Sequence, residues 1–306
     1  MQKHLMSEFL MKPKVDFAFK ELMTDETVRN GFLSAVLELK PEDIHKTAIM
    51  NTELRRIHQD EKQGILDVHL LLNDDTEIDI EIQLSKLDVW SDRALYYLSK
   101  MFGNQLSPGE GYRILYRCIN ISILDFKLFA DSEEFYSVFG FYERRRHTRA
   151  TDKMEFHVIE LPKLPEKLEE NSSDLLLWAK FISAEKKEEF EMLSGKNASI
   201  DRAYERLQVI SLDRQKRMEY EAREKAVRDY NEMMMESRES GLEMGLEQGL
   251  ELGLERGRTE GISVGEKRKA FDIAKKLLAS GVDEKIIAES TGLSLAQIEE
   301  LKALAE

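Results

Sequence analysis

The chain has 306 residues, of which 34% are charged and 42% hydrophobic, and its net charge is −14. This is enough apolar sequence for one large domain with an appendage, or for two domains. No stretch approaches the roughly 18 apolar residues of a transmembrane helix, and the start of the chain lacks the pattern of a secretory signal, so we expect no membrane association.

The charge also restricts how the protein could bind nucleic acid. An acidic protein repels phosphates at long range, so a contact with DNA must come from a local basic patch or from a bound cation. The single cysteine, Cys118, excludes an intramolecular disulfide and fits a reducing, cytoplasmic environment. Because Cys118 lies in an apolar run, we interpret it as a structural thiol.

The first part of the chain predicts helices and a β-hairpin. Residues 15–40 carry apolar side chains at helical spacing. Two strand-like runs, 64–72 and 76–84, flank a turn-like sequence at 73–75, which is the clearest hairpin signal in the chain. Residues 88–106 again have a helical apolar stripe.

The middle of the chain predicts more strands and then helices. Strands are expected within 112–126, 137–148 and 153–161, the last two around a polar turn. From residue 166 onward the pattern is helical. This order of elements predicts an α/β fold with a mixed sheet flanked by helices.

The C-terminal third has a different composition. A highly charged helix is expected over 212–236, and residues 269–306 predict three short helices. Between these segments glycine recurs at every fourth position, at Gly241, Gly245, Gly249, Gly253, Gly257, Gly261 and Gly265.

The glycine repeat predicts self-association. Seven glycines inside a helix cost roughly 6 kcal/mol relative to alanine, so an isolated helix is disfavoured. Packing of two such helices would offset the cost, because the absent side chains let the backbones approach closely, and a period above 3.6 residues implies a right-handed crossing. We therefore favour a homo-oligomer formed through 239–266, and a flexible linker is the alternative.

The tail has the spacing of a helix-turn-helix in Ala288, Gly292, Ser294 and Ile298. In a DNA-binding domain of this type, residues 295–304 would enter the major groove. That segment contains two glutamates and one lysine, which is a poor balance for phosphate contact. We therefore favour a small dimerisation or partner-binding domain over sequence-specific DNA binding.

The hairpin carries acidic residues that a cation could hold together. By strand alternation, Asp79, Glu81 and Gln83 share one face, and a turn centred on Asp74 places Asp67 opposite Glu81 or diagonal to it. Like charges in these positions destabilise a hairpin unless a cation lies between them. Oxygen ligands select a hard ion such as Mg²⁺ or Mn²⁺. The alternative is a half-exposed hairpin whose acids are solvated.

The same residues resemble a known nuclease signature. Asp67, followed after thirteen residues by Glu81-Ile82-Gln83, resembles the PD-(D/E)XK motif with glutamine in place of the usual lysine. With the segments 14–23, 90–112 and 156–163, the chain resembles the recombination-promoting nuclease / putative transposase family over roughly residues 12–260.

This resemblance implies a restriction-endonuclease-like fold and metal-dependent hydrolysis of DNA phosphodiesters, with a role in recombination or mobile elements. Asp67 and Glu81 would hold Mg²⁺ or Mn²⁺, and Gln83 would orient water or phosphate without supplying charge. The alternative is a weak or inactive nuclease fold that binds DNA or protein.

The resemblance also implies accessory residues on the helices around the hairpin. Asp16 and Lys20 share a helix face that lines the cleft in the family, although four-residue spacing also fits an ordinary ion pair. Arg93, Tyr97 and Gln105 lie on or after the next helix, where related nucleases contact the substrate backbone. Solvent exposure of Arg93 and core packing of Tyr97 are the alternatives.

A dense basic cluster, Arg144, Arg145 and Arg146, lies at the tip of the later hairpin and could bind DNA phosphates. Charge balance with the nearby Glu133, Glu134 and Glu143 is the alternative.

These observations divide the chain into four expected parts. They are a nuclease-like core at 1–165, a helical extension of it at 166–238, the glycine-repeat helix or linker at 239–266, and a small all-α domain at 267–306.

Overall fold

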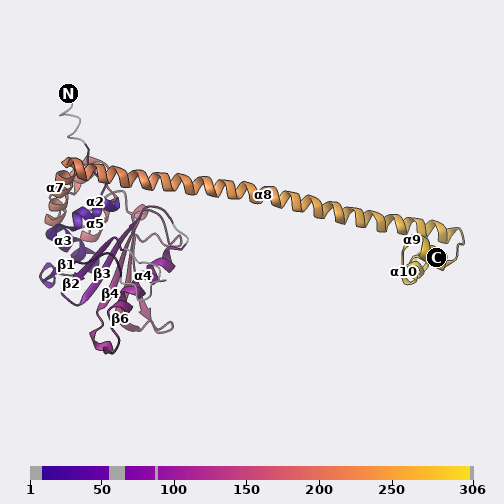
Figure 1. Ribbon diagram of the computed structural model, residues 1–306, viewed down its shortest axis with the longest axis horizontal. Coiled ribbons are helices and arrows are strands. Elements are labelled where there is room, and N and C mark those ends of the chain that lie inside the picture. The colour runs from indigo at the N-terminus through magenta and orange to yellow at the C-terminus, as the bar shows by residue number, and fades with distance from the viewer. Residues whose placement is uncertain (1–8, 55–65, 87–88, 304–306) are drawn as a thin grey trace, which may run out of the picture. The chain divides into compact units, whose positions relative to one another are not determined.

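The computed structural model describes residues 9–54, 66–86 and 89–303 (Figure 1). The chain forms two compact units, residues 1–231 and 232–306, and the long helix α8 (Arg214–Ala279) contributes to both. Within the described ranges, no helix combines the length and the apolar character needed to cross a membrane.

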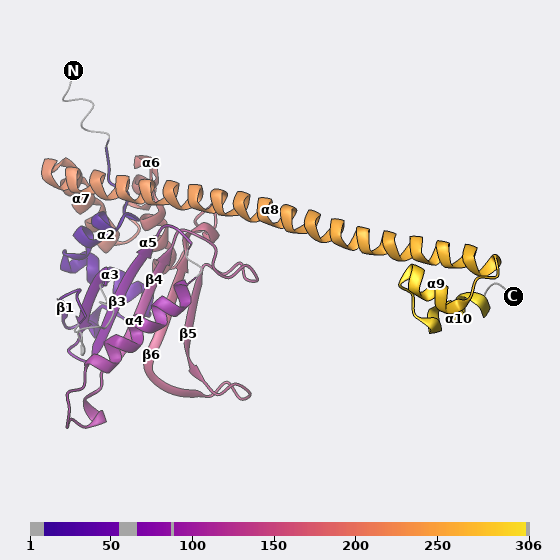
Figure 2. The same cartoon turned by 45° about the vertical axis from the view of Figure 1, so that its right-hand side comes forward.

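The first unit is built on a six-stranded mixed sheet with the order β1-β2-β3-β4-β6-β5 (Figure 2). Strands β3, β4 and β6 are parallel to one another, and the other neighbours are antiparallel. The predicted α/β fold with a mixed sheet is therefore confirmed. The strands are β1 (Thr47–Ile49), β2 (Val68–Leu72), β3 (Thr76–Gln83), β4 (Arg117–Leu124), β5 (Tyr136–Tyr142) and β6 (Arg149–Glu160).

The hairpin of β2 and β3 has the register that the turn predicts. Val68 pairs with Ile80 and His69 pairs with Asp79. The turn residues Asn73 and Asp74 have positive φ angles of 53° and 62°, which these residue types tolerate better than most. Strand β2 begins at Val68, so Asp67 lies just before the strand and not inside it.

Helices cover both faces of the central strands. On one face, Ile78, Ile80 and Ile82 belong to the main core together with α2 (Asp16–Met23), α3 (Glu26–Leu37) and α5 (Asp174–Ser183). Across the other face lies α4 (Trp90–Asn104), which packs through Tyr97, Leu98 and Met101 (Figure 2). Parallel strands are normally covered in this way. The acids of β3 therefore lie inside the protein, and the solvated-hairpin alternative is wrong.

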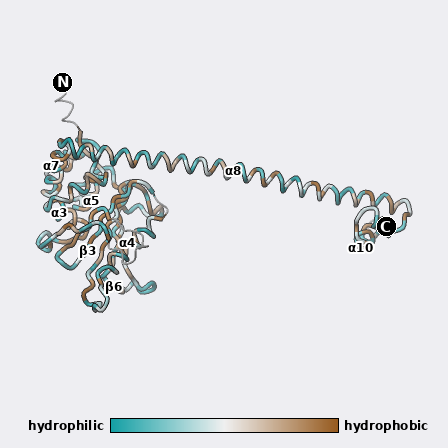
Figure 3. The backbone as a smooth tube through the Cα atoms, in the orientation of Figure 1, coloured by the Kyte–Doolittle hydropathy of each residue, from teal (hydrophilic) through white to brown (hydrophobic). Residues whose placement is uncertain are grey.

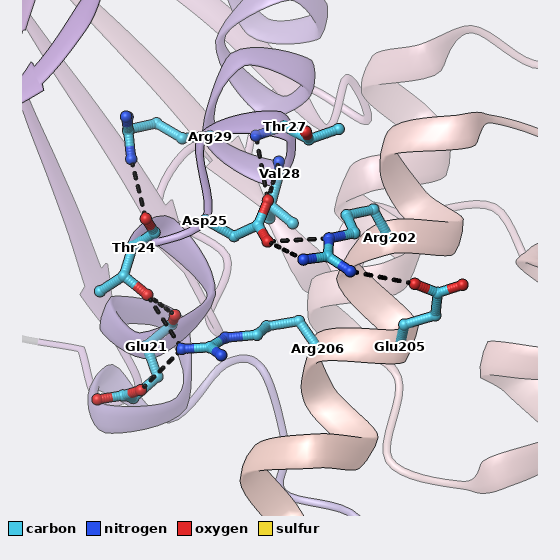
Figure 4. Close-up of polar contacts among 9 residues, drawn as sticks. All are labelled: Glu21, Thr24, Asp25, Thr27, Val28, Arg29, Arg202, Glu205 and Arg206. Carbon is cyan, nitrogen blue, oxygen red and sulfur yellow. Dashed lines mark hydrogen bonds and ion pairs between the residues drawn. The ribbon is translucent and has the colours of Figure 1, made fainter.

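The position of α2 is fixed by contacts with α7 (Ala198–Leu212). Arg202 on α7 contacts Asp25 at 2.8 Å, and Arg206 lies 3.7 Å from Glu21 (Figure 4). Asp25 also caps α3 by accepting hydrogen bonds from the first backbone N–H groups of that helix. Gly31 lets α3 approach α7 closely, because a Cβ there would lie 2.1 Å from the Ser199 hydroxyl.

The remaining short elements of this unit complete the helical layer and the connections. They are α6 (Lys187–Leu193) and the 3₁₀ turns η1 (Pro41–Asp43), η2 (Tyr112–Ile114) and η3 (Leu161–Lys163).

The second unit contains the later part of α8 together with α9 (Glu284–Thr291) and α10 (Leu295–Ala303). Its small core consists of Ala274, Ile287, Leu293, Ile298 and Leu301. The glycine repeat is helical throughout, in contrast to the flexible-linker alternative, and hydrophobic and hydrophilic residues alternate along it (Figure 3). A Cβ added at any of the seven glycines would meet no other atom within 4 Å.

Candidate active site

A pocket of about 330 Å³ opens where the end of β3 meets α2, α4 and the first turns of α8. It brings together four of the residues that the sequence singled out, which come from three separate segments. The residues that line it are Lys14, Asp16, Asp67, Ile82, Gln83, Leu84, Ser85, Arg93, Arg223, Ala226, Val227, Tyr230 and Asn231.

Asp67 is held by a lysine from α2. Lys20 Nζ donates a hydrogen bond to Asp67 Oδ1 at 3.0 Å and lies 3.7 Å from Asp16 Oδ2. The backbone N–H of Ile82 donates to the other oxygen of Asp67 at 3.4 Å. The Asp16–Lys20 pair is thus more than a local helix contact, because the lysine also reaches an acid 47 residues further along the chain.

Glu81 lies beside this pair and is paired with an arginine from α4. Glu81 is only 4% exposed, and Arg93 Nη2 lies 3.3 Å from Glu81 Oε2. Burial raises the pKa of Glu81 to about 7; the positive charge of Arg93 opposes this rise, and the negative charge of Asp67 adds to it. Arg93 therefore compensates a buried carboxyl group and also lines the pocket.

We predicted no role for Asp79, although strand alternation places it on the same face as Glu81. Asp79 is 1% exposed, and its Oδ2 accepts a hydrogen bond from Asn120 Nδ2 at 2.8 Å. Its Oδ1 is buried and has no partner among the residues described. Burial, followed by the charge of Glu81, raises the pKa of Asp79 well above its usual range. The charges of Glu81 and Asp67 both act on Asp79, so the three acids occupy the same region of the sheet.

The donor set fits a hard divalent cation. Mg²⁺ is commonly bound by only one or two carboxylates, with water and substrate oxygens completing its shell. Asp67 and Glu81 can supply two such oxygen ligands. Burial raises the pKa values of Glu81 and Asp79, and a bound cation would favour their charged forms. In the described part of the chain, no three potential ligands from His, Cys, Asp and Glu form a ready-made metal cluster.

Lysine and arginine side chains supply the positive charge at the pocket, since the glutamine at position 83 carries none. Gln83 lines the pocket at the end of β3. Lys14, which the sequence did not indicate, lies at its edge and contacts Asp125 at 2.9 Å and Glu185 at 2.7 Å. The partners of Lys14 are distant in sequence, so no local pattern could have revealed them.

Four of the predicted catalytic and accessory residues do not line the pocket. Lys20 and Glu81 each pair with a residue that does, Asp67 and Arg93, whereas Tyr97 and Gln105 have other contacts. Tyr97 is 9% exposed and packs in the core under α4, where its ring lies 5.7 Å from the Arg93 guanidinium. Gln105 lies beyond the opposite end of α4 and donates hydrogen bonds to Glu77 Oε2 and Cys118 Sγ, both at 2.9 Å. We therefore correct both predictions, since Tyr97 supports Arg93 and Gln105 satisfies buried polar groups.

Cys118 and Glu21 also have structural roles. Cys118 is fully buried, and burial raises the pKa of its thiol, which makes it unreactive. Glu21, on α2, pairs with Lys216 and Arg206 and does not line the pocket.

The basic cluster Arg144, Arg145 and Arg146 forms the exposed turn between β5 and β6. The carboxylate of Glu143 accepts the backbone N–H groups of Arg145 and Arg146 and pairs with the Arg146 side chain at 3.2 Å. The charge-balance alternative therefore holds for Arg146, while the side chains of Arg144 and Arg145 make no ion pair with any described residue.

The raised pKa of Glu81 predicts a pH-dependent stability. Between its ordinary pKa of 4.5 and about 7, the folded protein keeps a proton that the unfolded chain releases. The free energy of unfolding therefore falls as the pH rises through this window. Glu81→Gln removes the effect, so its stability relative to wild type should rise by on the order of 3 kcal/mol from pH 5 to pH 8.

Urea denaturation in EDTA at both pH values measures this difference. The exposed Glu134→Gln is the matched control and should show no such change. An equal response of the two variants to pH would contradict the prediction.

The chain matches the models of two known families. Residues 267–303 match the model of the C-terminal helix-turn-helix (HTH) domain of the Rpn/YhgA-like nuclease family. This match agrees with the helix-turn-helix spacing in the tail, and the preference for a dimerisation or partner-binding role stays a prediction. The unfavourable glutamates, Glu299 and Glu300, are exposed on α10, whereas the buried residues set the type of fold.

The first unit matches a nuclease family. Residues 13–237 match the model of the PD-(D/E)XK nuclease family transposase. No curated protein and no solved structure matches the chain. Because the first match spans well over half of the 306 residues and includes every segment that lines the pocket, the chain belongs to the PD-(D/E)XK nuclease family of transposases.

Proposed function

We propose that the protein is a divalent-metal-dependent endodeoxyribonuclease that hydrolyses DNA phosphodiester bonds. The observation that carries this proposal is that Asp67 lines the pocket and Glu81 pairs with Arg93, which also lines it. Each of the two acids is thus paired with a cation from a different helix. The family supports a nuclease role, and we propose that this nuclease acts in DNA recombination or in mobile elements.

In the proposed mechanism, Asp67 and Glu81 hold Mg²⁺ or Mn²⁺. When bound, such an ion polarises the scissile phosphate and lowers the pKa of a coordinated water. Lys20 and Arg93 stabilise the two carboxylates and present positive charge to the approaching phosphodiester. Gln83 can donate a hydrogen bond to a phosphate oxygen or accept one from water.

A second candidate function is DNA or protein binding without cleavage. Gln83 favours it, because the usual lysine of the motif is absent. The ion pairs Lys20–Asp67 and Arg93–Glu81 are also compatible with it, because they leave the acids compensated without a metal.

Substitution of the two acids tests the nuclease proposal. Asp67→Asn and Glu81→Gln should each reduce plasmid cleavage by more than about 100-fold, which exceeds the 10–100-fold loss typical of residues that only orient metal ligands. Nicking and linearisation of supercoiled plasmid in Mg²⁺, Mn²⁺ or EDTA provide the measurement.

Glu134→Gln is again the control and should cleave like wild type. Metal-dependent cleavage that survives both acid substitutions would overturn the site assignment. If wild type binds DNA and does not cleave it with either metal, the second candidate function is correct.

We also propose that two surfaces outside the pocket contact DNA, the HTH domain and the turn at 144–146. In the turn, Arg144 and Arg145 are free to bind phosphates, whereas Arg146 already pairs with Glu143. Arg144→Gln/Arg145→Gln should therefore weaken binding to all duplex sequences and lower the salt dependence of the affinity by about two phosphate contacts.

Fluorescence anisotropy with two unrelated duplexes over a range of salt concentrations measures this slope. Arg146→Gln is the matched control and should have a much smaller effect. A double variant whose salt slope equals that of wild type would show that the turn does not contact DNA.

Self-association through 239–266 is also part of the proposal. In the second unit, the repeat glycines contact nothing, and the leucines that follow them at Leu242, Leu246, Leu250 and Leu254 are exposed. A second copy of the helix would cover both sets of residues.

We therefore expect wild type to be oligomeric. Gly249→Leu/Gly253→Leu should reduce the mass in solution, because the added side chains keep two backbones apart. Gly249→Ala/Gly253→Ala, whose side chains are small, serves as the control. Sedimentation gives the masses, and a monomeric wild type would refute the idea.

A further inference from the structure

The first turns of α8 form one wall of the pocket. Five residues of this helix line it, at positions 223, 226, 227, 230 and 231. The spacings of three, four and seven residues place them on a single face of the helix. This face of α8 is therefore turned toward the end of β3 and the start of β2, where Gln83 and Asp67 line the same pocket.

Contacts on both sides of this segment hold α8 in place. Tyr220 is 2% exposed, and its hydroxyl accepts a hydrogen bond from the backbone N–H of Lys12 at 3.2 Å. Lys216 pairs with Glu21 on α2. At the end of the segment, the hydroxyl of Ser85 donates a hydrogen bond to Asn231 Oδ1 at 2.6 Å. The part of α8 before residue 223 is thus attached to the core, and residue 231 is attached to the loop after β3.

Arg223 differs from the other cations that line the pocket. Lys14 pairs with Asp125 and Glu185, and Arg93 pairs with Glu81. Arg223 is exposed and makes no hydrogen bond or ion pair with any residue that the structure describes. Two neighbouring arginines on the same helix, six and five residues from Arg223, are paired: Arg217 with Glu221 and Arg228 with Glu224.

An unpaired arginine suits the charge of the expected substrate. Asp16 and Asp67 line the same pocket, so an approaching phosphodiester meets negative charge there. Gln83 does not compensate this charge as a lysine would. A guanidinium can donate two parallel hydrogen bonds to phosphate and stays charged at every physiological pH.

We propose that Arg223 binds a backbone phosphate of the DNA in this pocket and supplies the positive charge that Gln83 lacks. This inference rests on the proposed nuclease function. It assigns to the beginning of α8 a direct contact with the substrate, in addition to its structural contacts with α2.

Arg223→Gln tests the proposal, with Lys225→Gln as the matched control, because Lys225 is exposed on the same helix and does not line the pocket. Duplex affinity is measured by fluorescence anisotropy in Ca²⁺ over a range of salt concentrations, and kcat and KM are measured in Mg²⁺. Urea denaturation checks that both variants are folded.

We expect Arg223→Gln to raise Kd and KM by about tenfold, since a hydrogen bond to a charged group is lost. The salt slope of the affinity should fall by about one phosphate contact, a change that a purely structural role would not produce. Arg223→Lys should restore most of the slope, and Lys225→Gln should behave like wild type.

The outcomes separate this inference from the nuclease proposal. If wild type cleaves DNA and Arg223→Gln retains its KM and salt slope, Arg223 does not bind phosphate while the nuclease function stands. If wild type binds DNA without cleaving it and Arg223→Gln weakens that binding, the phosphate contact stands and the nuclease function fails. A wild-type protein that does not bind DNA would overturn both.

Discussion

The burial of acidic side chains on strand β3 is the constraint on which the rest of the site depends. β3 lies inside the sheet and is covered on both faces, so its alternating pattern places Glu77, Asp79 and Glu81 in the interior. A buried carboxyl group is costly unless it is hydrogen-bonded, paired or protonated. The neighbours of β3 must therefore supply cations and donors along its whole length.

The partners that stabilise the buried carboxyl groups differ along β3. At its beginning, Glu77 contacts His69 at 2.7 Å and accepts a hydrogen bond from Gln105, so both of its oxygens are satisfied. Asp79 has a partner on only one oxygen, and Glu81 depends on Arg93. The two acids nearer the pocket thus have fewer hydrogen-bond partners than Glu77.

Lysine and arginine side chains provide positive charge near the pocket, although the protein as a whole is acidic. The net charge of −14 gives no general attraction to phosphates, so positive charge must be local. Lys20 and Arg93 reach the acids from α2 and α4, and Arg223 faces the pocket from α8. Helix α8 lines this pocket between residues 223 and 231, and its last turns belong to the core that α9 and α10 complete. One continuous helix therefore contributes to both the nuclease unit and the HTH unit.

The sequence alone determined the local features of the protein. The turn residues and the two-residue alternation of β2 and β3 set the hairpin register, and the motif around Asp67 and Glu81 indicated the family, because both depend on neighbours in sequence. Only the tertiary structure buried Asp79 and Glu81, removed Gln105 from the pocket and brought Arg223 into it. Helical spacing shows which residues share a face, but the packing of distant segments decides what that face meets.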